Sequence, residues 1–333
     1  MNSLHKNIIA SYLFIWLCSL MACKQPEPSI PVGTSSITIY NDWAKFGTIP
    51  SQFENRNNAV SFQINQKVFI GTGVNGTKKL DDFWLLNLTD SSWQKLSNFP
   101  GGKRFSAISF AIGQDGYLGL GFDSINKELN DLWKFNSETG IWLKVKDLPS
   151  TGRSGATAFV INNFAYVGLG KNLDSNRNDF WKYDPTIDQW TELNNFPGGA
   201  RSHAISFISN GQAYAGTGNN GSYLKDLWQY DLIQDNWIQK ADLPGNGIDA
   251  ASSFANDFRG YVGGGWNGQF GYTSDFFEYN PFNNTWKKIE SIPNSGKWGS
   301  VAFVNQTTGF VGLGKTAGIN NEIWQYRPFM FNE

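Results

Sequence analysis

Short apolar runs separated by turn residues recur along most of the chain. One such set begins with an apolar run at residues 107–111, followed by the turn residues of 113–116 and a second apolar run, 117–121, that ends in glycines. A third run at 131–135 starts with an acidic residue, and a fourth at 142–145 starts with Trp. No segment shows sustained helical spacing of its apolar residues, so the pattern predicts short β-strands joined by tight turns.

Two sequence markers repeat six times and show how these strands are grouped. The first is an acidic residue followed two positions later by an aromatic one, at Asp82/Trp84, Asp131/Trp133, Asp179/Trp181, Asp226/Trp228, Asp275/Phe277 and Glu322/Trp324. The second is a Trp followed seven positions later by Pro, at Trp43/Pro50, Trp93/Pro100, Trp142/Pro149, Trp190/Pro197, Trp237/Pro244 and Trp286/Pro293. Four short antiparallel strands in each repeat predict a propeller blade, and six copies predict an all-β, six-bladed β-propeller.

The two ends of the chain predict how the ring closes. The first Trp–Pro unit, Trp43/Pro50, lacks a preceding acid-aromatic strand, and the last acid-aromatic strand, at 322–326, lacks a following Trp–Pro unit. We therefore expect residues 37–46 to form the outer strand of the last blade. An open array of six repeats is the alternative, and it would leave an unpaired strand at each end.

These repeats resemble Kelch repeats over roughly residues 37–329. The resemblance is carried by the evenly spaced Trp, by the Tyr of Trp-Lys-Tyr-Asp-Pro at 181–185, and by glycine pairs after the second strand, at Gly119/Gly121, Gly168/Gly170, Gly216/Gly218 and Gly312/Gly314. These pairs have one residue between the glycines, whereas adjacent glycines are common in the family. The chain looks most like bacterial Kelch lipoproteins labelled galactose-oxidase-like, a resemblance that implies a fold and not an activity.

The first 36 residues have the pattern of an export signal and a tether. A short basic region, His5 and Lys6, precedes an apolar stretch of 13 residues at 8–20, too short for a bilayer span of about 20 residues. Residues 20–23, Leu-Met-Ala-Cys, resemble the bacterial lipobox, in which the Cys becomes the lipidated N-terminus. We predict a lipoprotein signal peptide over 1–22, lipidation of Cys23, a flexible tether over 23–36 and the propeller over 37–329.

Lipidation would make this a membrane-anchored protein of the bacterial cell envelope, because several acyl chains exceed the two signals needed for stable attachment. Lys24 follows the Cys, and by resemblance to Gram-negative sorting this favours the outer membrane. The alternative is an ordinary secretory signal that happens to contain Cys23.

Composition narrows the functional classes. The chain has 27 basic and 28 acidic side chains and a net charge of −1, which argues against a nucleic-acid binder. It has only 2 His and 2 Cys, so a disulfide framework is excluded and neither a metal nor another cofactor is expected. Galactose-oxidase chemistry needs a copper held by two His and a Tyr–Cys crosslink, and the predicted propeller has one His and no Cys.

A cation precedes the first strand in five of the six repeats. Six residues before an aligned Phe stand Arg56, Arg104, Arg153, Arg201 and Lys297, whereas the fifth repeat has Ile248. Around a central channel these cations would attract a carboxylate, sulfate or phosphate. Kelch adaptors of ubiquitin ligases and the bacterial sialic-acid mutarotase, which this chain resembles here, use Arg at such positions. The alternative is that each cation pairs with the acid that begins the third strand and only fixes blade geometry.

Two Trp of the propeller fall outside the repeat register, Trp266 and Trp298. Trp266 shares the loop between the second and third strands of the fifth repeat with Phe270 and Tyr272, and Trp298 precedes the first strand of the sixth. We expect an asymmetric groove there, in which the rings stack on sugars. The alternative is that they cover loop ends or plug the channel. His203 is interpreted as a packed polar residue rather than a catalyst.

The sequence therefore favours a binding module for a glycan or protein ligand over an enzyme, because it lacks a recognisable catalytic constellation. The ligand would lie on the face that carries the loops between strands two and three and the loops between blades. An acidic-sugar mutarotase or epimerase and a structural envelope assembly protein are the alternatives.

Overall fold

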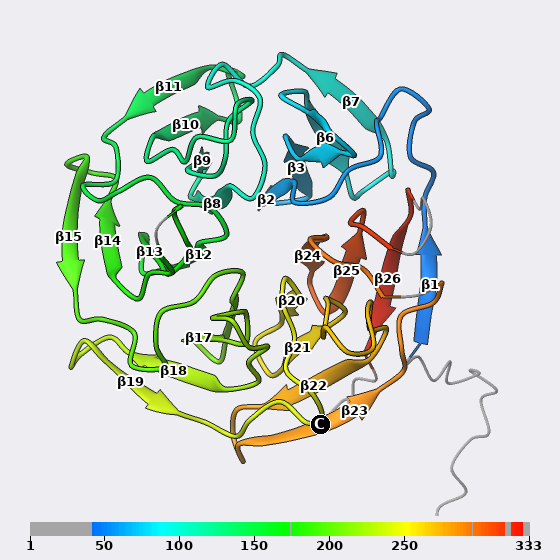
Figure 1. The fold of residues 1–333 in the computed structure, drawn as a ribbon. Coiled ribbons are helices and arrows are strands. Elements are labelled where there is room, and N and C mark those ends of the chain that lie inside the picture. Colours follow the sequence, from blue (N-terminus) through cyan, green and yellow to red (C-terminus); the bar gives the residue numbers. More distant parts are fainter. Residues whose placement is uncertain (1–41, 174, 295, 317–320, 329–333) are drawn as a thin grey trace, which may run out of the picture. The chain divides into compact units, whose positions relative to one another are not determined.

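Six four-stranded antiparallel sheets follow one another around a central axis in the computed structural model, which describes residues 42–173, 175–294, 296–316 and 321–328 (Figure 1). Each sheet is one blade, and its strands follow chain order from the centre of the ring to its edge in all but the last blade. The predicted all-β, six-bladed propeller is therefore confirmed.

The strands of the first three blades have the following bounds. Blade one comprises β2 (Val60–Ile64), β3 (Lys67–Gly71), β6 (Phe83–Asn87) and β7 (Trp93–Leu96), with the small hairpin β4 (Val74–Asn75) and β5 (Lys78–Lys79) in its second loop. Blade two comprises β8 (Ile108–Ile112), β9 (Asp115–Gly119), β10 (Leu132–Asn136) and β11 (Trp142–Val145). Blade three comprises β12 (Thr157–Ile161), β13 (Phe164–Gly168), β14 (Phe180–Asp184) and β15 (Gln189–Leu193).

The last three blades follow the same plan. Blade four comprises β16 (Ile205–Ser209), β17 (Gln212–Gly216), β18 (Leu227–Asp231) and β19 (Asn236–Gln239). Blade five comprises β20 (Ser252–Ala255), β21 (Gly260–Gly263), β22 (Phe276–Asn280) and β23 (Thr285–Ile289). Blade six comprises β24 (Val301–Asn305), β25 (Thr308–Gly312), β26 (Ile323–Arg327) and, as its outer strand, β1 (Asp42–Phe46).

Blade six joins the two ends of the propeller, as the marker order predicts. Strand β1 pairs antiparallel with β26, in a register that runs from Asp42 opposite Arg327 to Phe46 opposite Ile323 (Figure 1). This pairing excludes the open array, because the first and last repeats share one sheet. Residues 37–41 of the predicted closing strand lie outside the described residues.

The hydrophobic core lies between neighbouring blades. Strand β3 shows why the second strands are nearly continuous in apolar residues, since Val68, Phe69 and Ile70 are all buried between two blades. The outer strands are largely exposed instead, and their Trp reaches back to the preceding blade: the Trp142 ring lies 5.2 Å from that of Phe83. The evenly spaced Trp are therefore architectural.

The Gly-x-Gly pairs have a steric cause. A Cβ on Gly119 would lie 2.2 Å from the carbonyl oxygen of Asp131, so no side chain fits where the second strand meets the third. Gly121 has a φ of +85°, which glycine adopts without the strain a Cβ would cause. The motif thus lets the acid that begins the third strand approach the second strand closely.

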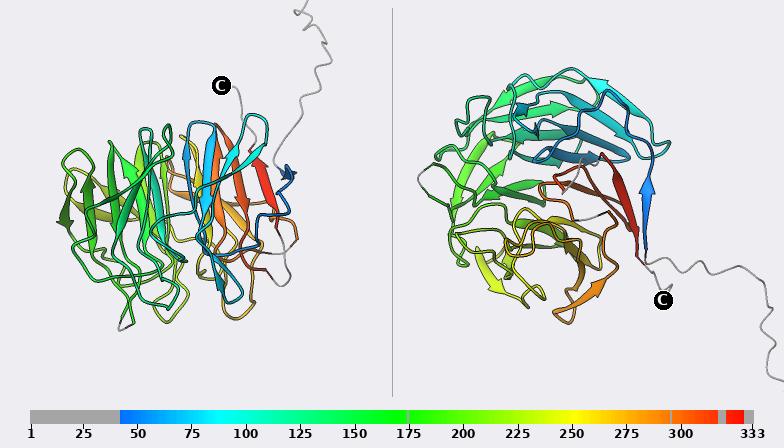
Figure 2. Two further views of the ribbon diagram at one scale, coloured as in Figure 1. Left: turned by 90° about the horizontal axis from the view of Figure 1, so that it is seen from above. Right: turned by 45° about the vertical axis from the view of Figure 1, so that its right-hand side comes forward.

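Figure 2 shows the same ring of sheets in two further views. Hydroxyl groups join the blades around a central pocket that residues of the first strands line. The Ser109 hydroxyl donates to the Ser61 carbonyl of the previous blade at 2.8 Å. Ser206 and Ser253 donate in the same way to Ala158 and Ser206, each at 2.8 Å. Because each bond crosses between blades, the inner wall is tied together independently of the apolar core.

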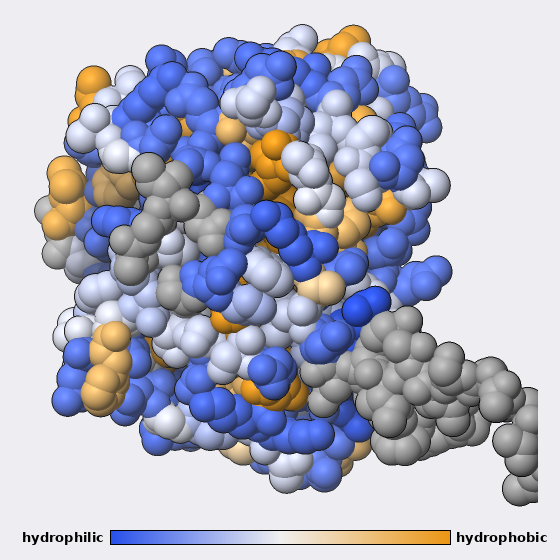
Figure 3. Space-filling model, turned by 90° about the vertical axis from the view of Figure 1, so that its right-hand side faces the viewer, coloured by the Kyte–Doolittle hydropathy of each residue, from blue (hydrophilic) through white to orange (hydrophobic). Residues whose placement is uncertain are grey.

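The signal peptide over 1–22, the tether over 23–36 and Cys23 lie outside the described residues and remain predictions. In the described part, no helix is long and apolar enough to cross a membrane. The side of the ring on which β1 lies is mainly hydrophilic, and its apolar residues form small separate spots (Figure 3).

Candidate functional site

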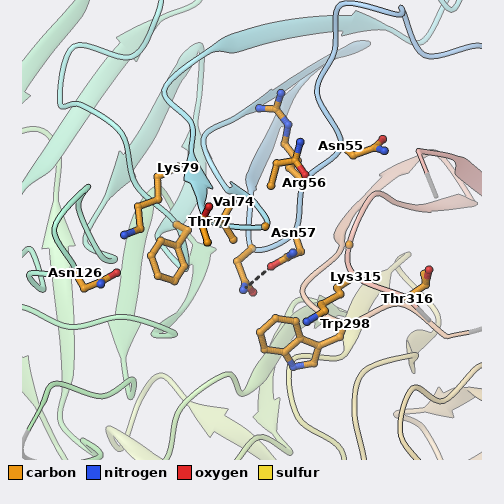
Figure 4. A pocket seen from close by; sticks show the side chains of 15 residues that line it. Asn55, Arg56, Asn57, Val74, Thr77, Lys79, Asn126, Trp298, Lys315 and Thr316 are labelled. Atoms are coloured by element: carbon orange, nitrogen blue, oxygen red, sulfur yellow. Dashed lines mark hydrogen bonds between the residues drawn. The ribbon is translucent and has the colours of Figure 1, made fainter. Parts of the chain in front are cut away.

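One end of the ring carries a pocket of about 630 Å³, lined by two sets of loops. The loops between blades contribute Asn57 and Trp298, and the loops between second and third strands contribute Lys79, Asn126 and Lys315. Lys79 and Asn126 approach from one side and Trp298 and Lys315 from the other (Figure 4). The two loop sets therefore share one face, as strand order implies.

A second pocket of about 460 Å³ adjoins the first, and Asn58, Phe105 and Trp298 line both. It adds Lys171 and His203. We call the two pockets together the mouth. Its lining is rich in amide side chains, supplied by Asn55, Asn57, Asn58, Asn126, Asn176 and Asn219.

A chain of backbone hydrogen bonds runs around the ring at the level of the mouth. Its members are equivalent residues of the six blades, all with φ between 46° and 62°: Asn58, Ser106, Gly155, His203, Ala250 and Gly299. Successive N–H groups donate to the equivalent carbonyl of the previous blade in four cases, at 2.7–3.1 Å, and the Asn58 N–H closes the ring on Gly299 at 2.7 Å. Among the described residues, no such bond joins Ala250 to His203.

Asp249 lies directly before Ala250, where this series of backbone hydrogen bonds is interrupted. Its carboxylate accepts a hydrogen bond from the Trp298 indole N–H at 3.3 Å and lies 3.2 Å from Nδ1 of His203. Asp249 is buried, and the His203 and Trp298 rings lie edge to face with centroids 6.1 Å apart. One carboxylate from blade five thus orients side chains from blades four and six toward the mouth.

The four predicted arginines lie in ion pairs within their own blades. Each guanidinium makes two hydrogen bonds to the acid that begins the third strand, at 2.5–2.9 Å, and is at most 3% exposed: Arg56 with Asp82, Arg104 with Asp131, Arg153 with Asp179 and Arg201 with Asp226. This geometry matches the alternative in which the cations fix blade geometry. Ligand binding by these arginines stays an untested prediction, and we build no site on them.

The acid-x-Trp marker is explained by the same pairs. In four blades the Trp two residues after the acid donates its indole N–H to that carboxylate at 2.7–2.8 Å. Burial favours a raised pKa for Asp82 and Asp179, but the hydrogen bonds and charge of Arg56 and Arg153 outweigh it, so both pKa values are lowered. The marker is thus a structural unit that holds a half-buried carboxylate, and at Asp82 and Asp179 it favours the ionised form.

Blade six departs from this pattern at Lys297. Its side chain is 1% exposed, and its ammonium has no hydrogen-bond partner among the described residues. Glu322, the acid of this blade, instead accepts from Lys45 of β1 at 2.8 Å. Burial lowers the pKa of Lys297 to about 8, and the charge of Glu322 offsets only part of that shift.

This lowered pKa predicts a specific pH dependence of stability. Between pH 8 and about 10.5 the unfolded chain holds a proton that the folded chain has lost, so the contribution of Lys297 to the unfolding free energy becomes more favourable as pH rises. We expect Lys297→Met to be more stable than the parent at pH 7 by up to ~3 kcal/mol. This advantage should shrink by pH 10.5 in urea titrations. A difference that stays constant across this range would contradict the prediction, because both proteins share all other titrating groups.

The off-register aromatic residues fall into two separate places. Trp298 lines the mouth, whereas Trp266 and Tyr272 pair with each other, with ring centroids 4.9 Å apart. Phe270, at the tip of the same loop, is 66% exposed. Of these four residues, only Trp298 lines the two pockets of the mouth, and the groove at blades five and six stays a prediction.

Several residues of the mouth were not selected from sequence. Phe105 directly follows Arg104, the cation of blade two. It could have been selected as an aromatic residue in a loop of the predicted ligand face. The amides occupy loop positions where Asn is common for its turn geometry, so their clustering becomes visible only in three dimensions. Within the part of the chain that the structure describes, no group of three or more His, Cys, Asp or Glu is placed to hold a metal ion.

Comparison with known proteins agrees with this architecture. Residues 105–255 match the model of the KLHDC2/KLHL20/DRC7 Kelch-repeats domain. Among solved structures, one titled "Structure of YjhT" is similar with a TM-score of 0.69 and 20% identity, over 81% of this chain and 93% of that one. At this identity the likeness concerns the fold alone. No curated protein matches the sequence.

Proposed function

We propose that this Kelch-repeat, six-bladed propeller is a binding module whose ligand is a glycan held in the mouth. The observation that supports the proposal is the combination of amide side chains with the Trp298 and Phe105 rings on one recessed surface. An amide both donates and accepts, which suits the hydroxyl groups of a sugar, and an aromatic face suits its apolar C–H face. A protein ligand is the alternative occupant.

The mouth is organised before any ligand arrives. Asp249 holds Trp298, and the side-chain N–H of Asn58 donates to the Asn57 side-chain oxygen at 3.0 Å, which fixes both amides (Figure 4). The backbone chain beneath them restricts the loops further. Little conformational freedom is then lost on binding, and a sugar can be held by few contacts.

The test is a comparison of the two off-register tryptophans. We expect Trp298→Ala to weaken binding of glycans identified on an array by about 1–3 kcal/mol, or roughly five- to 150-fold in Kd, through loss of a stacking surface in the mouth. Trp266→Ala is the matched control for ligands of one or two sugar units, because Trp266 lines neither pocket. Equal affinity of parent and Trp298→Ala in calorimetric titrations, or no glycan bound by the parent, would reject the proposal.

The His203–Asp249 contact favours a second candidate, an acidic-sugar mutarotase or epimerase. Opening a sugar ring requires a base at the anomeric hydroxyl and an acid at the ring oxygen, and an imidazole in the mouth is suited to proton transfer. Lys171, in the same pocket, offers a cation for a sugar carboxylate. NMR of freshly dissolved sialic-acid anomers tests this candidate, and equilibration no faster than in buffer excludes it.

Attachment to a bacterial outer membrane through Cys23 is part of the same proposal and rests on the lipobox-like sequence. Membrane fractionation of Cys23→Ser against the parent tests it, since loss of the anchor should release the protein. A purely structural envelope role would instead give a stoichiometric protein partner and indifference to sugars.

A further inference from the structure

The second loop of blade five is a rigid hairpin whose residues 264–274 include no charged side chain. Trp266 and Tyr272 pair across it, and the Asn267 N–H donates to the Gly271 carbonyl at 3.1 Å. The Asn267 side-chain oxygen accepts from the Phe270 N–H at 2.8 Å, so the tip is tied to its base. The second loops of blades one, two, three, four and six all carry lysine, which makes the blade-five loop chemically distinct.

One exposed aromatic ring lies on this hairpin and a second lies beside it. Phe270 stands at its tip and is 66% exposed. Tyr223 comes from the neighbouring loop of blade four and is 38% exposed, with its ring directly against Gly268, where a Cβ would lie 2.2 Å from Tyr Cε2. Gly268 has a φ of +72°, so both its conformation and its lack of a side chain favour this contact. Tyr223 therefore packs against the hairpin, and both aromatic side chains are exposed to solvent.

Asp249 links the hairpin to the mouth. Its backbone N–H donates to the Trp266 carbonyl at 2.8 Å, and the Trp266 N–H donates back at 2.9 Å. The carboxylate of the same residue contacts His203 and Trp298 inside the mouth. The hairpin thus begins beside the mouth.

We infer that this hairpin is a second subsite that holds further sugar units of a glycan whose end lies in the mouth. The inference rests on the proposed function and specifies its ligand as an oligosaccharide. Phe270 and Tyr223 offer faces for sugar C–H groups, and Asn267 and Gln269 offer uncharged partners for hydroxyls. The absence of cations in the loop disfavours an anionic lipid surface as the occupant.

The experiment uses chain length as its variable. The probes are N-acetylglucosamine, xylose, glucose and mannose oligomers of two and six units, titrated against the full-length protein. We expect six-unit ligands to bind the parent more tightly than two-unit ligands, and Phe270→Ala to remove roughly five- to tenfold of affinity from the longer ligand alone. Trp298→Ala should weaken both lengths. Leu173→Ala is the matched control, since Leu173 is an exposed apolar residue, 84% accessible, on the corresponding loop of blade three.

The outcomes separate this subsite from the mouth. An unchanged six-unit affinity in Phe270→Ala, or an equal loss for both lengths, would overturn the second subsite while leaving glycan binding in the mouth intact. An equal loss in Leu173→Ala would overturn it as well. If the parent binds none of these oligomers, the proposed function and the subsite both fail. Binding of a protein at Phe270 in place of a glycan would also reject the inference.

Discussion

Asp179→Asn should lower the free energy of unfolding by about 3–5 kcal/mol at pH 7, because it leaves the Arg153 guanidinium buried without its counter-charge. Arg153 is fully buried and donates two hydrogen bonds to this carboxylate at 2.7 Å. Its other bonds reach the Leu169 and Thr151 carbonyls and the Ser150 hydroxyl, which are neutral and cannot replace the lost charge.

The loss should depend on pH in a defined direction. The pKa of Asp179 is lowered in the folded chain, so the stabilisation is present above the unfolded value of about 3.9 and is lost as pH falls through the folded value. Urea titrations at pH 7 and pH 3, followed by Trp fluorescence, should show a large difference from the parent at pH 7 and a smaller one at pH 3. Asp242→Asn, an exposed acid with the same charge change, is the control. Equal effects of the two substitutions would show that the ion pair contributes little.

Trp43→Ala should cost about 3–5 kcal/mol, since it removes a buried aromatic residue from the strand that closes the ring. The Trp43 ring lies 4.9 Å from Phe276 of blade five and 5.1 Å from Tyr326 of blade six, and its N–H donates to the Glu290 carbonyl at 2.9 Å. Loss of these contacts weakens both the docking of β1 and the joint between the last two blades.

Trp190→Ala provides the comparison for Trp43→Ala. Trp190 is the second residue of β15 and makes the same kind of bond to the preceding blade, to the Lys146 carbonyl at 2.9 Å, but its strand is covalently continuous with its own blade. We expect Trp43→Ala to lower the unfolding midpoint more and to increase aggregation in size-exclusion runs, because a detached β1 exposes the edge of β26. A smaller effect at Trp43 than at Trp190 would contradict this role for β1.

Local and repetitive features were accessible from the sequence. The acid-x-Trp marker reports a bond within one strand, between Asp131 and Trp133 for example, so its spacing alone carries the information. Ring closure was predicted because the first repeat lacks an acid-aromatic strand and the last repeat lacks a Trp–Pro unit. Both kinds of inference need only the order of residues along the chain.

The candidate site was less accessible because its residues are assembled from different blades. Asp249 contacts His203 and Trp298, which are 46 and 49 residues away in sequence. No rule of residue spacing predicts whether side chains so far apart in sequence are in contact. For the same reason, the sequence did not distinguish Trp298, which lines the mouth, from Trp266, which packs against Tyr272. For the arginines, the repeat spacing identified the acids as possible partners. It did not show whether each ion pair is buried, because burial depends on adjacent loops, such as the one in which the Gly101 carbonyl accepts a hydrogen bond from Arg104.

The partnership of β1 with β26 has a consequence for biosynthesis. Five blades consist of consecutive segments and can form as soon as each segment is free to fold, but the sixth must wait for β26. The first strand to emerge is therefore the one that stays without its partner longest, and its contact spans nearly the entire polypeptide. A chain that lacks β26 can hold five complete sheets and still lack the closed ring, so the arrival of this one strand decides whether the propeller is finished.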